Sequence, residues 1–78
     1  MYKRQVRNSV IFPGVKIGKN SKVINSVVMQ NTVIEENVII NKAIIADNVT
    51  VKKNTVVGDD EHIAIIGQGK TVKSEAIK

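Results

Sequence analysis

The side chains best suited to acid–base chemistry lie together in segment 59–62, which reads Asp-Asp-Glu-His. His62 is the only histidine in the chain, and a histidine can act as a general base near neutral pH. The three carboxylates beside it could bind a hard cation. A short polar segment between apolar stretches is typical of a solvated loop, so we predict a loop here without a catalytic or metal-binding role.

Glu35 and Glu36 form a second motif that resembles a functional site, because paired carboxylates can do acid–base work or hold a metal. Seventeen residues later the chain carries Lys52 and Lys53, and Lys19 precedes Glu36 by the same interval. If the chain folds with that period, the opposite charges pair and contribute about 0.2–1 kcal/mol each. We therefore interpret them as structural.

Other features exclude several classes of protein. The Gly-Gln-Gly run at 67–69 lacks the further glycine of a phosphate-binding loop and predicts a turn. The chain has no cysteine, which excludes a disulfide framework and a thiolate metal site and fits a reducing compartment. It shows no apolar signal region, and no apolar run approaches the roughly 20 residues that span a bilayer. We expect a cytoplasmic protein that does not enter a membrane.

The formal net charge of +5, from 12 Lys and Arg against 7 Asp and Glu, raises the question of nucleic-acid binding. The basic residues form no dense block, and only Tyr2 and Phe12 could stack on bases. We predict no nucleic-acid partner. Arg4, Arg7 and Lys16 could contribute to a site for an anionic effector, although solvated surface charges are the simpler explanation.

A repeat of 17 residues organises the chain. Its strongest positions form three columns, with steps of six, six and five residues within each turn, and all nine members are Ile or Val. A second set lies two residues before each of these, and its members are all small or β-branched. Residues two apart face the same side of a strand, so both sets should point inward. The columns are Ile11, Val28 and Ile45; Ile17, Ile34 and Val51; and Val23, Ile40 and Val57.

Turn-forming residues separate these columns. One set is Asn20, Asn37 and Asn54, and another is Gly14, Asn31 and Asn48. Asn tolerates the left-handed backbone region better than most non-glycine residues. Three short strands per turn, stacked in register, predict a triangular prism whose walls are parallel sheets. The predicted fold class is all-β, a single-stranded parallel β-helix of about three to four coils, and the apolar spacing does not support a helix.

The repeat covers most of the chain, which we take as one domain. Its predicted parts are regular coils over 6–58, a loop over 59–62, a partial terminal coil over 63–73 and a tail over 74–78, within a domain of 1–78. The repeat starts in mid-turn at Val6, so we expect a missing N-terminal continuation; a mature protein with a short leading strand is the alternative. Open ends of the prism expose strand edges, which predicts that the isolated chain self-associates.

The most informative surface feature is apolar. Residues that flank the first inward column should point outward, yet they are hydrophobic in all three turns. Stacked turns bring them together, and an outward patch of this kind marks an interface with another domain or subunit. The interface candidates are Val10, Phe12, Val27, Met29, Ile44 and Ala46.

Two levels of resemblance follow from these motifs. Hexads such as Ile-Gly-Lys-Asn-Ser-Lys at 17–22 resemble the hexapeptide repeats of left-handed parallel β-helices. That resemblance implies the left hand, against the general preference for right-handed crossovers. The longer stretches 8–18 and 25–34 resemble the C-terminal domain of bacterial glucose-1-phosphate adenylyltransferase (ADP-glucose pyrophosphorylase), of either the catalytic or the regulatory-type subunit.

The resemblance implies that an N-terminal nucleotidyltransferase domain is absent from this chain. In that family the missing domain uses ATP, glucose 1-phosphate and Mg²⁺ to make ADP-glucose and pyrophosphate for glycogen synthesis. No position here matches its nucleotide loop, so no catalytic, cofactor-binding or metal-binding residue is carried over. The resemblance further implies a non-catalytic domain that serves subunit assembly in a tetramer, and regulation by an anionic sugar-phosphate or nucleotide effector.

Two other functions stay open at this point. A fragment of a hexapeptide-repeat acyltransferase would bind acetyl-coenzyme A at a trimer interface and would need His62 as its base. A stand-alone β-helix scaffold would need neither. A self-contained metal site of the β-helical carbonic anhydrase type is excluded, because it requires three histidines.

Overall fold

The computed structural model describes residues 5–58, 61 and 63–73, and these contain twelve short strands and no helix. The strands form three parallel four-stranded sheets, named A, B and C here. Sheet A consists of β1 (Gln5–Arg7), β4 (Lys22–Ile24), β7 (Ile39–Asn41) and β10 (Val56–Val57). Sheet B consists of β2 (Val10–Ile11), β5 (Val27–Val28), β8 (Ala43–Ile45) and β11 (Ala64–Ile66). Sheet C consists of β3 (Lys16–Ile17), β6 (Val33–Ile34), β9 (Thr50–Val51) and β12 (Thr71–Val72).

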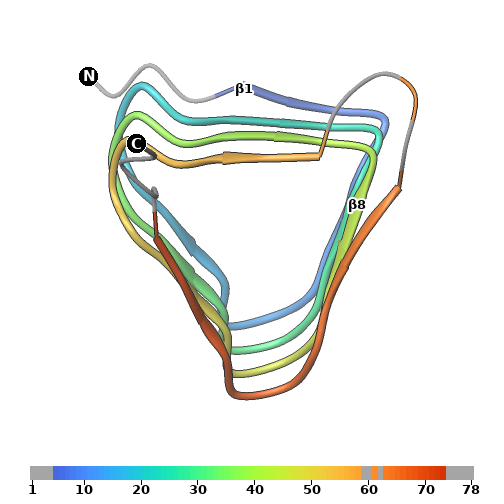
Figure 1. Cartoon of the computed structure of the whole chain (residues 1–78), viewed down its shortest axis with the longest axis vertical. Helices are drawn as coiled ribbons and strands as arrows, with labels where there is room; N and C mark the ends of the chain where they lie inside the picture. The colour runs from blue at the N-terminus through green and yellow to red at the C-terminus, as the bar shows by residue number, and fades with distance from the viewer. Residues whose placement is uncertain (1–4, 59–60, 62, 74–78) are drawn as a thin grey trace.

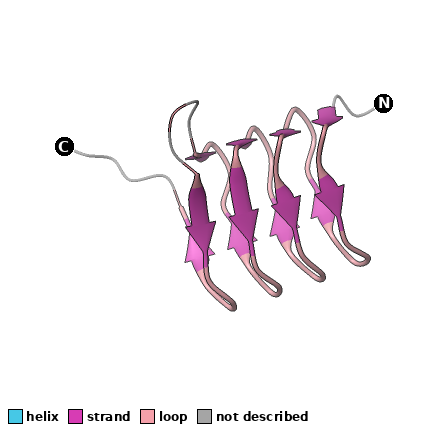
Figure 2. Cartoon of the chain, turned by 90° about the vertical axis from the view of Figure 1, so that its right-hand side faces the viewer, coloured by secondary structure: helices cyan, strands magenta, loops and turns pink. Residues whose placement is uncertain are grey.

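Successive strands belong to successive sheets, so the chain winds around a triangle (Figure 1). In that view the chain runs clockwise, with β1 along the top and β8 on the right. Figure 2, in which the front of Figure 1 lies to the left, shows that the chain advances toward the viewer of Figure 1. A clockwise path that approaches the viewer is left-handed. The predicted all-β, left-handed parallel β-helix is therefore confirmed, with about 4 turns and a period of about 17 residues.

The predicted inward columns form the core. In the first column Val28 and Ile45 have no exposed surface, whereas Ile11 and Ile66, at the two ends of the same column, are only partly buried. A coil can bury its inward side chains fully only between two neighbouring coils. The core is therefore tightly closed in the middle and open at both ends.

The second inward set is also buried, and its hydroxyl groups join neighbouring coils. The Ser26 hydroxyl donates to the carbonyl of Ile24 (2.7 Å) and accepts a hydrogen bond from the N–H of Ala43 in the next coil (3.1 Å). The hydroxyls of Ser21 and Thr32 likewise accept from N–H groups seventeen residues later in the chain. These side chains satisfy buried backbone groups at the corners, where the sheets end.

Each corner of the triangle is turned by residues with a left-handed backbone. The two sets of Asn and Gly identified in the sequence have φ between 58° and 80°, as predicted. The third corner, between sheets A and B, was missed: it is formed by Asn8, Asn25 and Lys42, with φ of 47°, 52° and 54°. Asn adopts this region at low cost, whereas Lys does not. Lys42 therefore holds a strained position.

The last coil is longer at this same corner. Sheet B pairs Ile44 with Val27, seventeen residues earlier, but with Ile65, twenty-one residues later. The four additional residues fall between β10 and β11, where a loop over 59–62 was predicted. The strand–turn–strand pattern expected after that loop is confirmed as β11 and β12.

Candidate functional site: the apolar outer face of sheet B

The outer face of sheet B, which faces the viewer in Figure 2, is apolar along its whole length. Val10, Val27, Ile44 and Ile65 are in register across its four strands. Their neighbours in the strands point inward to the core, so these four side chains point outward. They form the first row of the apolar face.

Phe12, Met29 and Ala46 form a second row, one residue beyond the first-column members. Each of their N–H groups donates to a carbonyl of the next coil, at 2.9, 2.9 and 3.0 Å. Phe12 is 37% exposed, and Met29 and Ala46 are half-buried. The structure thus brings all six interface candidates onto one face. That this face binds a partner stays a prediction.

The apolar face extends further than the sequence analysis placed it. Ile65 continues the first row, and Ile63 lies just before it, with 75% and 65% of their surfaces exposed. Both were missed because the register of the repeat breaks after Gly58, so the period alone could not assign them to a sheet. The order Ala-Ile-Ile, which occurs at 43–45 and again at 64–66, is the signal that could have found them.

Polar residues border the apolar face on both sides. At the corner between sheets B and C, a carboxylate oxygen of Asp47 accepts hydrogen bonds from the amides of Asn48 (3.3 Å) and Gln68 (3.1 Å). At the corner between sheets A and B lie Lys42 and Glu61. An apolar, uncharged centre inside a polar rim is the usual anatomy of a protein–protein interface.

A shallow hollow of about 480 Å³ opens at the corner between sheets A and B. Two of its lining residues, Val27 and Ile44, belong to the first row of the apolar face. The hollow is mostly aliphatic, and its polar side chains are one amide, one ammonium group and one carboxylate. Asn25 supplies the amide, Lys42 the ammonium group and Glu61 the carboxylate, and Ile63 adds a further aliphatic side chain.

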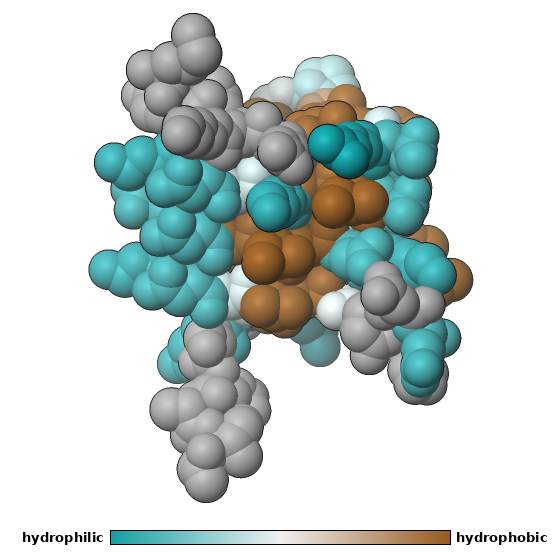
Figure 3. All heavy atoms as spheres, turned by 90° about the horizontal axis from the view of Figure 1, so that it is seen from above, coloured by the Kyte–Doolittle hydropathy of each residue, from teal (hydrophilic) through white to brown (hydrophobic). Residues whose placement is uncertain are grey.

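The outer face of sheet A carries a second apolar strip that the sequence analysis missed. Figure 3 looks onto this sheet and shows hydrophobic side chains gathered between hydrophilic margins. Val56, 67% exposed, and Ile39 lie in register with Lys22 in one outward row, and Ile24 belongs to the next row. The strip was missed because that row begins with two polar residues, Gln5 and Lys22, so it did not stand out as an apolar column.

Of the three basic residues considered for an effector site, the structure describes two, and these lie on different sheets. Arg4 lies outside the described residues. Arg7 is exposed at the end of β1 on sheet A, and Lys16 is exposed at the start of β3 on sheet C. The whole of β2 separates them, so the structure does not bring Arg7 and Lys16 together. An effector site that uses either residue stays a prediction.

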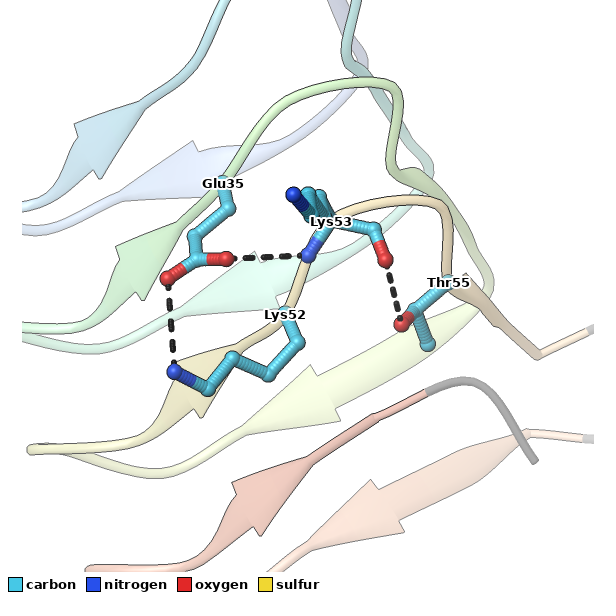
Figure 4. A network of polar contacts seen from close by, with 4 residues as sticks. All are labelled: Glu35, Lys52, Lys53 and Thr55. Atoms are coloured by element: carbon cyan, nitrogen blue, oxygen red, sulfur yellow. Dashed lines mark hydrogen bonds and ion pairs between the residues drawn. The ribbon is translucent and has the colours of Figure 1, made fainter.

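The predicted pairing of Glu35 with Lys52 between coils is confirmed (Figure 4), whereas the pairing of Glu36 with Lys19 and Lys53 stays a prediction. Lys52 Nζ lies 3.7 Å from Glu35 Oε2, and the N–H of Lys53 donates to Glu35 Oε1 at 3.0 Å. In the same view the Thr55 hydroxyl donates to the Lys53 carbonyl at 3.4 Å. Both carboxylate oxygens of Glu35 therefore contact the next coil, which supports a structural role for this residue.

The described residues include few acidic side chains. Among them, no group of three or more His, Cys, Asp or Glu side chains could hold a metal ion. The same residues include no helix long and apolar enough to cross a membrane. His62 and the pair Asp59-Asp60 lie outside the described residues, so the loop and catalytic interpretations of these side chains stay predictions.

Comparison with known proteins relates nearly the whole chain to one family. The family model described as GlmU-like, C-terminal hexapeptide, matches residues 2–76. Glucose-1-phosphate adenylyltransferases from Clostridium kluyveri and Fusobacterium nucleatum subsp. nucleatum are 60% and 62% identical to this chain over 73 residues. Those residues make up 94% of this chain but 19% of each relative, where they form the C-terminal domain. No solved structure matches the chain.

Proposed function

Because this chain belongs to the GlmU-like C-terminal hexapeptide family, we propose that it is the C-terminal domain of a glucose-1-phosphate adenylyltransferase, where it is non-catalytic and serves assembly and allosteric regulation. Such an enzyme makes ADP-glucose and pyrophosphate from ATP and glucose 1-phosphate, in the cytoplasm, for glycogen synthesis. The identity to two such enzymes supports the assignment of the parent. The apolar outer face of sheet B carries the assembly role.

A non-catalytic role is supported by the contacts of the polar side chains. The Ser26 hydroxyl bonds backbone groups of two coils, and the Glu35 carboxylate holds the next coil through Lys52 and Lys53. The acidic side chains of the described residues form no metal-binding cluster. We therefore assign Mg²⁺ and ATP to the nucleotidyltransferase domain of the parent enzyme.

The partner of the apolar face is proposed to be that nucleotidyltransferase domain or a neighbouring subunit of a tetramer. Apolar surface left in water costs about 25 cal/mol per Å², and an interface removes that cost. The face carries two outward rows without a charged residue, bordered by polar corners. Sheet C, with its pairs between coils, is the wall we expect to face solvent.

Regulation is proposed to involve the basic side chains of the first coil. Arg7 and Lys16 lie on different sheets, so each would supply a separate positive charge to an anionic effector bound against another part of the enzyme. Replacement of either residue should then weaken the response of the enzyme to the effector, and the two replacements should act independently of each other. Arg4 lies outside the described residues, so this proposal is argued from Arg7 and Lys16.

A chimera of the Clostridium kluyveri enzyme, in which this chain replaces the matching 73 residues, tests the proposed function. It should assemble and form ADP-glucose. Phe12→Glu with Met29→Glu buries two carboxylates in the interface and should weaken assembly about hundredfold or more. Thr71→Glu, at an exposed position on sheet C, is the control. Sedimentation velocity and ADP-glucose formation are the measurements, and a double variant that assembles like the control would refute the assignment of this face.

Two assays of the isolated 78-residue chain test the non-catalytic part. With ATP, glucose 1-phosphate and Mg²⁺ it should form no ADP-glucose, and any turnover would contradict the proposal. Titration calorimetry with acetyl-coenzyme A should show no binding. Clear binding that His62→Ala abolishes would instead favour the acyltransferase alternative.

A further inference from the structure

We infer that the hollow at the corner between sheets A and B is the socket of the docking face, and that it receives one uncharged aromatic or branched aliphatic side chain of the partner. The inference rests on the proposed function and takes the nucleotidyltransferase domain, one of the two partners proposed above, as the one that covers the apolar face of sheet B. The matched residues are 19% of each relative, so most of such an enzyme lies outside this domain and could supply that cover. The inference goes further than the proposed function in two respects. It names the part of the docking face where the binding energy is concentrated, and it names the kind of side chain that supplies this energy.

The first reason is continuity. Val27 and Ile44 belong both to the first row of the apolar face and to the lining of the hollow. A partner that covers this row therefore lies directly over the opening. Interfaces concentrate their affinity in a few large side chains that fill such pockets, while the flat surroundings serve mainly to exclude water.

The second reason is the charge of the lining. The polar side chains around the hollow include one ammonium group, from Lys42, and one carboxylate, from Glu61. Together they are neutral, so the hollow selects neither an anion nor a cation. With a lining that is mostly aliphatic and a volume of about 480 Å³, it suits a large uncharged side chain.

The third reason is that two irregularities of the fold coincide at this hollow. Lys42 keeps a left-handed backbone (φ 54°) in a corner column where the earlier members are Asn8 and Asn25. The longer turn of the last coil contributes Glu61 and Ile63 to the lining. Strained backbone positions cluster at functional sites, and here the strained Lys42 lines the same hollow as Glu61 and Ile63.

The test uses the thiol introduced by Ala46→Cys, on the second row of the apolar face. This chain contains no cysteine of its own, so in a chimera freed of other cysteines the thiol reports whether the face is covered. The protection factor is the rate of thiol modification in the isolated chain divided by the rate in the chimera. Docking should make it about tenfold or larger.

Ile44→Trp fills the hollow with the chain's own side chain and should lower the protection factor about tenfold or more. Val10→Trp places the same side chain on the same row, outside the hollow, and should lower the factor several times less than Ile44→Trp does. Thr71→Trp, at an exposed position on sheet C, is the control that should leave the factor unchanged. Ile63→Ala, which opens one wall without altering a sheet, should also lower it. Far-UV circular dichroism of each isolated variant confirms that the coils are intact.

The possible outcomes separate the two proposals. A loss of protection that is several times larger with Ile44→Trp than with Val10→Trp, together with a loss with Ile63→Ala, supports the socket. Equal effects of Ile44→Trp and Val10→Trp, or no effect of either, overturn the socket while the docking face stands. Absence of protection in the unmodified chimera overturns the docking face itself and the socket with it.

Discussion

Single hydroxyl groups connect neighbouring coils, and Ser26 shows how much one can contribute. Its Oγ accepts from the buried N–H of Ala43 at 3.1 Å. Ser26→Ala leaves that N–H without this acceptor, and a buried unsatisfied donor costs about 1–3 kcal/mol. We expect urea unfolding, followed by circular dichroism, to show a loss of that size. Thr71→Ala, at an exposed position, is the control and should change stability by less than about 0.5 kcal/mol; equal effects would contradict the role assigned to the hydroxyl.

Two glycines of similar backbone but different surroundings test how closely neighbouring elements pack. A Cβ built on Gly18, after β3, would lie 2.7 Å from the carbonyl carbon and oxygen of Glu35 in the next coil. On Gly67, after β11, it would meet nothing nearer than Lys70 Cε at 3.6 Å. Gly18→Ala must therefore push two coils apart and should cost about 1–3 kcal/mol. Gly67→Ala should be neutral or stabilise by up to about 1 kcal/mol. Thermal unfolding compares them, and an equal midpoint would refute the close packing at Gly18.

At the scale of the whole molecule, the described coils form a stack, and the outermost strands of each sheet have a described neighbour on one side only. Val6 belongs to an inward column and is in register with fully buried Val23, yet it is 45% exposed because β1 is the edge strand of sheet A among the described residues. Uncovered strands and apolar ends invite pairing with another chain. We expect sedimentation equilibrium to show self-association that rises with concentration. Val6→Lys should weaken it about tenfold or more, since the lysine would be buried. A chain that stays monomeric at millimolar concentration would contradict this expectation.

Much of the fold could be predicted from residue types and spacing. The columns through Val28, Ile34 and Ile40 predicted three walls, and the Asn columns predicted two of the three corners. Both succeed because inward packing and left-handed turns each demand a narrow set of side chains at every repeat. The third corner was missed because its last member is Lys42, and Lys does not signal a left-handed backbone.

The candidate site was only partly predictable. Val10, Phe12 and Met29 could be assigned to one outward face because they share the phase of the regular coils. Ile63 and Ile65 could not, because four additional residues shift the phase just before them. The strip on sheet A through Ile39 and Val56 was hidden for another reason: outward positions tolerate many residue types, and this row begins with the polar residues Gln5 and Lys22.

The sequence by itself determined the repeat, the inward columns and the apolar character of one outer wall, because these depend on which side chains recur every seventeen residues. The tertiary structure decided what depends on the position of one coil relative to the next. It showed Ile65 completing the first row, Arg7 and Lys16 lying apart on different sheets, and the hollow beside Lys42. A period predicts which residues stack, but an inserted turn or a corner sets distances across coils, and those distances appear only once the chain is folded.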